Sequence, residues 1–126
     1  RMSEKTVFGD IFRMAHSGKE IRLRNMNVTR DFLFIDDAVS AMQELMESGT
    51  GGIFNIGSSE PCTLQELSIA ISKEFFAARH VVRSEEKVSN QSYNVLDSSR
   101  LTAATSWRRS YALEDGLRAL RERKTP

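Results

Sequence analysis

The sequence has little of several residue types that mark particular classes of protein. It contains a single cysteine, Cys62, so an internal disulfide is excluded. One cysteine and two histidines cannot supply the ligand spacing of a zinc module. The longest uninterrupted apolar run is Phe32–Ile35, far short of the roughly 20 residues that cross a bilayer. We therefore expect no membrane partner, no metal and a reducing, cytoplasmic location.

An excess of charge of one sign is also absent. The 18 lysines and arginines are balanced by 17 acidic residues, which gives a net charge of +1. Because nucleic-acid-binding proteins concentrate basic residues on one face, nucleic acid is not an expected partner. Only two prolines occur, so no proline-rich linker divides the chain. The length of 126 residues suits one domain with a real core, and we treat residues 1–126 as a single unit.

Helical and strand patterns alternate along the first half of the chain. Apolar residues recur at helical spacing over 7–16, and Ile21–Arg24 alternates apolar and basic residues like a half-exposed strand. Phe32–Ile35 is apolar throughout, which predicts a strand covered on both faces. A helix follows from Asp36, and Ile53–Ile56 predicts a second strand. This order favours a parallel strand–helix–strand unit.

The second half of the chain continues the alternation. Thr63–Glu66 is a capping box that starts a helix running to about Ala78. His80–Val82 is typical of a short strand, and Asp97 or Ser98 can cap a helix that ends near Ala104. A final helix is predicted from the spacing of leucines between 113 and 120. The pattern as a whole predicts an α/β fold.

The residues that could carry chemistry are few. Cys62 has no basic neighbour in the sequence and is interpreted as a packed residue, and no paired nucleophile is found. Asp36 and Asp37, at the start of a helix, are interpreted as caps and not as a catalytic acid/base pair. Arg30 and Arg83 each lie beside a predicted strand, where a guanidinium group can bind phosphate with two parallel hydrogen bonds.

Several segments in a fixed order carry a resemblance to a known family. They are Thr29–Val39 (TRDFLFIDDAV), Gly52–Ser58 (GIFNIGS), Thr63–Leu67 (TLQEL), Asp97–Leu101 (DSSRL), Trp107 and Leu113–Leu117 (LEDGL). Together they resemble motifs of the extended short-chain dehydrogenase/reductase family, which contains NAD(P)-dependent sugar-nucleotide epimerases and dehydratases. The resemblance extends from about Val7 to Leu120.

The resemblance implies the C-terminal, substrate-binding part of such an enzyme: a small sheet with packed helices, lacking the N-terminal Rossmann cofactor half. The family's glycine fingerprint is absent, and so is its catalytic Tyr-x-x-x-Lys, because Tyr93 and Tyr111 are each followed four residues later by aspartate. We therefore expect NAD or NADP in the intact enzyme and none on this chain alone, with no catalytic residue here. Residues 31–48 are expected to pack on the absent cofactor domain.

Three substrate-binding residues follow from the same resemblance. Arg30 occupies the position of the arginine that contacts the pyrophosphate of a nucleotide sugar, Arg83 matches a second phosphate-binding arginine, and Leu23 lies where the family holds the nucleotide base. The tight turn of the family is replaced by Asn25–Asn27, so the base and the sugar stay open. The expected ligand is a nucleotide-sugar substrate.

Two questions remain open at the level of the sequence. Epimerase and dehydratase are not distinguished, and a non-catalytic α/β interaction module that keeps the family's shape without its ligand is the main alternative. The apolar residues between 31 and 47 also predict that the chain self-associates into a homo-oligomer, because an apolar strand with open edges is a template for pairing.

Overall fold

The computed structural model describes residues 6–18, 20–76, 82–84 and 92–124. Within these ranges the order of elements is α1 (Val7–His16), β1 (Ile21–Leu23), β2 (Thr29–Asp31), α2 (Ile35–Ser48), β3 (Pro61–Thr63), α3 (Leu64–Phe76), β4 (Val82–Ser84), β5 (Tyr93–Asn94), α4 (Ser99–Ala104) and α5 (Leu113–Lys124). Helices and short strands are mixed, as the sequence predicts for an α/β fold. None of the helices in the described ranges is long and apolar enough to cross a membrane.

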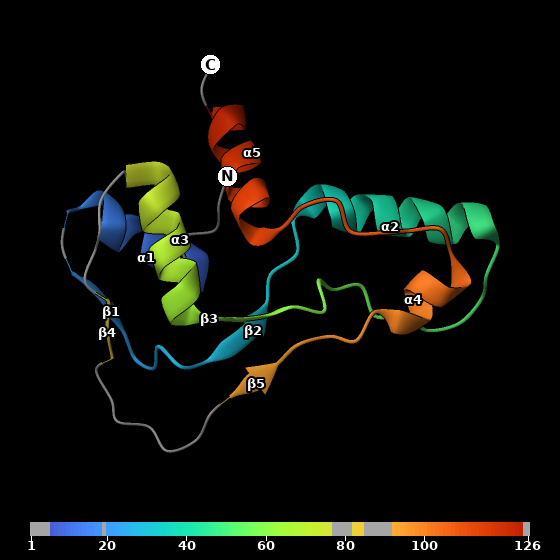
Figure 1. The fold of residues 1–126 in the computed structure, drawn as a ribbon, viewed down its shortest axis with the longest axis horizontal. Coiled ribbons are helices and arrows are strands. Elements are labelled where there is room, and N and C mark those ends of the chain that lie inside the picture. Colours follow the sequence, from blue (N-terminus) through green and yellow to red (C-terminus); the bar gives the residue numbers. More distant parts are fainter. Residues whose placement is uncertain (1–5, 19, 77–81, 85–91, 125–126) are drawn as a thin grey trace.

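The strands form two small sheets. In one, β1 pairs with β4 in parallel; in the other, β2 lies between β3, to which it is antiparallel, and β5, to which it is parallel. Figure 1 shows α1, α3 and α5 together at one end of the molecule, while α2 extends away from them beside α4. The position of β2 between two partners fixes its backbone from both sides.

The main hydrophobic core joins α1, α3 and α5 to β1. It consists of Ile11, Ala15, Ile21, Leu23, Leu64, Leu67, Ile71 and Leu117.

The predicted helix over 7–16 is confirmed, and so is the capping box of α3. In the latter, the Thr63 amide donates to Glu66 Oε2 at 2.7 Å and the Glu66 amide donates to Thr63 Oγ1 at 3.1 Å. These local signals are therefore sufficient to start α3.

A second, smaller core lies between α2 and α4. Its buried members are Ala41, Leu101 and Trp107, and the Trp107 indole donates to the Asp37 carbonyl at 3.1 Å. The opposite face of α2 is exposed, with 59% of Ile35 and 74% of Met46 accessible. The predicted apolar stripe of this helix is therefore only partly buried within the described residues.

The prediction of a strand at Phe32–Ile35 is wrong. The strand β2 ends at Asp31, the next three residues have no regular structure, and Ile35 begins α2. Phe34 packs its ring against Tyr111, with ring centroids 4.6 Å apart. The apolar pattern of Phe32–Ile35 predicts that these side chains are buried, but it does not require a strand. Packing of Phe34 against the segment before α5 supplies part of the burial.

The second predicted strand, Ile53–Ile56, is not formed either. Ile53 is 86% exposed, and both edges of β2 are already occupied by β3 and β5. No parallel strand–helix–strand unit therefore exists between 31 and 57. The predicted strand at His80–Val82 lies partly outside the described residues, which begin again with β4 at Val82.

Asp36 and Asp37 do not cap α2 as predicted. The N-cap position is Phe34, which makes no side-chain cap bond. Asp36 instead forms an ion pair with Arg123 of α5. The Asp37 carboxylate is 1% exposed and accepts hydrogen bonds from the backbone amides of Ser110 at 2.8 Å and Tyr111 at 3.0 Å. Both carboxylates therefore connect distant segments and leave the helix start uncapped.

Candidate functional site

A cavity of about 810 Å³ lies between α1, β1 and β2. Such a volume is typical of a small-molecule site. The apolar residues that line the cavity are Val7, Met14, Leu23, Val28 and Leu64. The charged groups that line it are Asp10, Arg13, Arg22, Arg24 and Arg30. Four arginines against one aspartate favour an anionic ligand that also has an apolar or aromatic part.

Arg30 projects into this cavity from the middle of β2. Its Nη1 donates to the Thr29 carbonyl at 2.8 Å and to the Ser92 carbonyl at 3.3 Å. A guanidinium group has five N–H donors, and within the described residues both of these bonds come from one nitrogen. Its backbone is fixed because β2 is paired on both sides. Arg30 is therefore a positioned donor with capacity for a phosphate.

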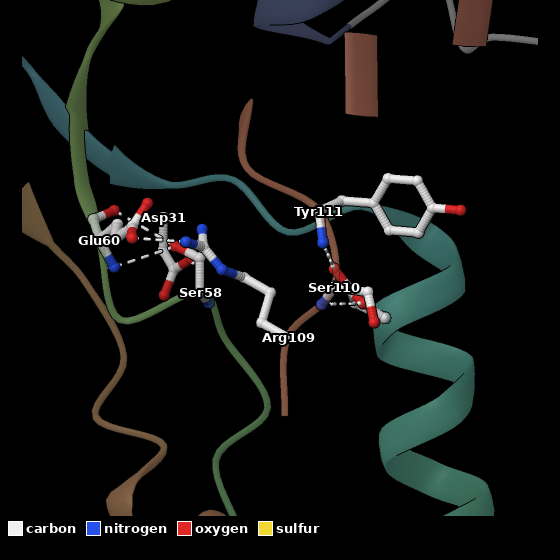
Figure 2. A network of polar contacts seen from close by, with 7 residues as sticks. Asp31, Ser58, Glu60, Arg109, Ser110 and Tyr111 are labelled. Carbon is white, nitrogen blue, oxygen red and sulfur yellow. Dashed lines mark hydrogen bonds and ion pairs between the residues drawn. The ribbon is translucent and has the colours of Figure 1, made fainter. Parts of the chain in front are cut away.

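The neighbouring Asp31 holds the surroundings of Arg30 in place. Its carboxylate accepts the Ser58 amide at 2.7 Å and the Leu96 amide at 3.1 Å. A side chain at Gly57 would clash with this carboxylate, so the close approach requires glycine. Figure 2 shows Asp31 beside Ser58, with the Arg109 side chain extending to Glu60, its ion-pair partner. Three segments thus meet at the half-buried carboxylate of Asp31, the residue directly after Arg30.

The other two predicted residues lie in different surroundings. Leu23 is 6% exposed, belongs to the main core and lines the same cavity as Arg30. Arg83 is not among the residues that line the cavity; its side chain forms an ion pair with Glu20. The structure therefore brings Leu23 and Arg30 together and places Arg83 one strand away, on β4.

Three arginines of the cavity were not predicted as site residues. Arg13 lies on α1, where it forms an ion pair with Asp10, and Arg22 and Arg24 lie on or directly after β1. The alternation of Ile21–Arg24 does predict that Arg22 and Arg24 share one face. It does not indicate which surface that face meets, because the approach of α1 depends on long-range packing.

Neither a metal centre nor an activated thiol is found among the described residues. No group of three or more metal-ligating side chains occurs within them. Burial, and then the negative charges of Glu66 and Glu114, raise the pKa of the Cys62 thiol to about 11, so it is neutral near pH 7. The interpretation of Cys62 as a packed residue agrees with this.

The chain is similar to enzymes that act on nucleotide sugars. The model of the NAD dependent epimerase/dehydratase family matches residues 2–57. A dTDP-4-dehydro-6-deoxyglucose reductase of Escherichia coli is 34% identical over 89 residues, which are 70% of this chain and 28% of the reductase. The chain thus spans less than a third of that relative.

Solved structures show the same fold. The chain resembles UDP-N-acetylglucosamine 4-epimerase from Bacillus cereus with a TM-score of 0.80 and 22% identity, over 98% of this chain and 44% of the epimerase. It also resembles UDP-glucuronic acid 4-epimerase from Bacillus cereus, solved with UDP-glucuronic acid and NAD, with a TM-score of 0.75 and 20% identity, over 92% and 38%. The likeness therefore extends over nearly the whole chain.

These findings correct one prediction about the position of the chain in the family. We expected the C-terminal, substrate-binding part, with the Rossmann half missing. The family match at residues 2–57 instead indicates the Rossmann cofactor part. That expectation rested on the resemblance of several short motifs and on the absence of two others, and neither locates a segment within a longer fold. The chain is thus similar, over residues 2–57, to the NAD dependent epimerase/dehydratase family, and it is fragment-sized beside the relatives it matches.

Proposed function

We propose that the arginine-lined cavity binds the diphosphate of a nucleotide sugar, and that this chain contributes to substrate binding in an NAD(P)-dependent epimerase, dehydratase or reductase without being catalytic alone. The observation that carries the proposal is the position of Arg30, whose guanidinium lines the same cavity as the apolar Leu23. Phosphate and base of one nucleotide need such neighbouring charged and apolar surfaces. A relative solved with UDP-glucuronic acid and NAD supports this ligand class.

Two related expectations are part of the proposal. NAD or NADP serves the intact enzyme, and this chain binds neither by itself, because its sequence contains neither the glycine fingerprint nor the Tyr-x-x-x-Lys. The exposed face of α2, within residues 31–48, packs against another part of the intact enzyme. Its exposed apolar side chains, including Ile35 and Met46, support that role.

Substitution of Arg30 tests the proposal. Charge-assisted hydrogen bonds contribute roughly 1.5–3 kcal/mol each, so Arg30→Ala should weaken the binding of UDP or dTDP about 10- to 100-fold in calorimetry. Arg30→Lys should recover only part of this loss, since a single ammonium cannot donate two parallel bonds to a phosphate.

Arg118→Ala is the matched control, because Arg118 is an exposed arginine of α5 paired with Asp115 and is not among the residues that line the cavity. It should leave nucleotide affinity unchanged. If Arg30→Ala bound nucleotide as tightly as the control, with its circular dichroism intact, the cavity would not be the phosphate site. A non-catalytic interaction module would then be the better interpretation.

A further inference from the structure

Glu20 connects the anion cavity to the arginine outside it. Its carboxylate accepts from Arg22 Nε at 3.0 Å through one oxygen and forms an ion pair with Arg83 through the other. The Glu20 side chain is 24% exposed, whereas those of Arg22 and Arg83 are 65% and 69% exposed. Glu20 is therefore the least exposed side chain of the three, and the two more exposed arginines both contact its carboxylate.

The two arginines face each other because of strand register. Arg22 of β1 is paired with Arg83 of β4 in the parallel ladder. Like charges at directly opposed positions destabilise a strand pair, so a carboxylate between them has a clear structural purpose. Arg22 also lines the cavity, which means that the same carboxylate occupies a donor of the candidate phosphate site.

We propose that Glu20 sets the affinity and the selectivity of the cavity by acting as an internal competitor for the guanidinium groups of Arg22 and Arg83. This inference rests on the proposed function of the cavity. An incoming anion must displace the carboxylate from Arg22 or share the guanidinium with it. A diphosphate offers more charge and more acceptor oxygens than one carboxylate, whereas a single phosphate offers little advantage. Glu20 therefore favours diphosphates over single phosphates.

The electrostatics of the group support the competition. Burial acts to raise the pKa of the Glu20 carboxyl, but the hydrogen bonds and charges of Arg83 and Arg22 hold it below its ordinary value. The carboxylate is therefore charged near pH 7. Removing that charge while keeping the shape of the side chain isolates its effect, and Glu20→Gln does so.

Calorimetry with inorganic pyrophosphate and with orthophosphate tests the inference. Exposed ion pairs are weak, so releasing Arg22, which lines the cavity, in Glu20→Gln should raise pyrophosphate affinity about three- to tenfold. The affinity for orthophosphate should rise by a larger factor, which lowers the preference for pyrophosphate. Adding Arg83→Ala to Glu20→Gln should leave this gain in place, because Arg83 is not among the residues that line the cavity.

Asp115→Asn is the matched control, because it removes one negative charge from an exposed ion pair of α5. Its effect on pyrophosphate affinity should stay below about twofold at physiological salt, where distant exposed charges are screened. A gain in Glu20→Gln no larger than in this control would overturn the inference.

A second variant covers the case in which Glu20→Gln does not fold. In Arg83→Gln, Glu20 keeps Arg22 as its one guanidinium partner, so pyrophosphate affinity should fall; an unchanged or higher affinity would overturn the inference. Failure of the proposed function is recognised separately. In that case pyrophosphate binding to the wild-type chain would be absent or insensitive to Arg30→Ala, and the role of Glu20 would be rejected together with the site.

Discussion

Asp37 should contribute more to stability than any exposed charge of α2. Its carboxylate is 1% exposed and accepts two backbone amides from the segment that leads into α5. In Asp37→Asn one oxygen becomes an NH₂ group that faces an amide donor. The NH₂ group and the backbone amide that it faces are both donors, so neither finds an acceptor. Burying these two unpaired donors should lower the free energy of unfolding by about 2–3 kcal/mol. With a urea dependence of about 1–3 kcal/mol per molar, the unfolding midpoint should fall by about 0.7–3 M.

The structure provides both the probe and the control for this measurement. Trp107 is the single tryptophan, and its indole donates to the Asp37 carbonyl, so its fluorescence reports on this site. Asp36→Asn makes the same substitution at the neighbouring residue. Asp36 pairs with Arg123 at the surface, where an ion pair contributes about 0.2–1 kcal/mol to stability. A larger loss of stability in Asp36→Asn than in Asp37→Asn would refute the reasoning.

Two further predictions concern the thiol and the exposed helix face. Alkylation of Cys62 by iodoacetamide should stay slow to about pH 10 and accelerate toward its pKa of about 11; a plateau near pH 9 would contradict this. Because this folded-state pKa is raised, the half-buried thiol stabilises the fold below the unfolded pKa and loses that contribution as pH rises toward 11. Light scattering over a concentration series should show self-association through residues 31–47. Met46→Lys, a change at a 74% exposed side chain, should reduce it, whereas a monomer at every concentration would exclude it.

Short-range signals in the sequence predict the helices well. The capping box of Thr63 and Glu66 needs only four residues, and the structure contains it. At α4 the N-cap residue is Ser98, which makes no side-chain cap bond, while Asp97 before it accepts the amide of Ser99, the first residue of the helix, at 2.8 Å. Both signals succeed because donor and acceptor lie within one helical turn.

Long-range partners explain what the sequence did not predict. The partners of Asp37 lie more than 70 residues away, so its adjacency to a helix start suggested the wrong role. The apolar run at Phe32–Ile35 indicates burial but does not say whether a strand or a loop provides it. At the site, Arg30 and Leu23 were predicted by resemblance and share a cavity, whereas the contribution of Arg13 depends on how α1 packs.

The division of the apolar residues into two cores affects how the molecule opens. The cavity with Arg30 borders the core of α1, α3 and β1, while Trp107 belongs to the core of α2 and α4. Separate cores can unfold as separate cooperative units with different free energies. Opening of the α2–α4 unit would then expose Trp107 while the cavity with Arg30 keeps its shape, so we expect tryptophan burial to be lost before the cavity opens.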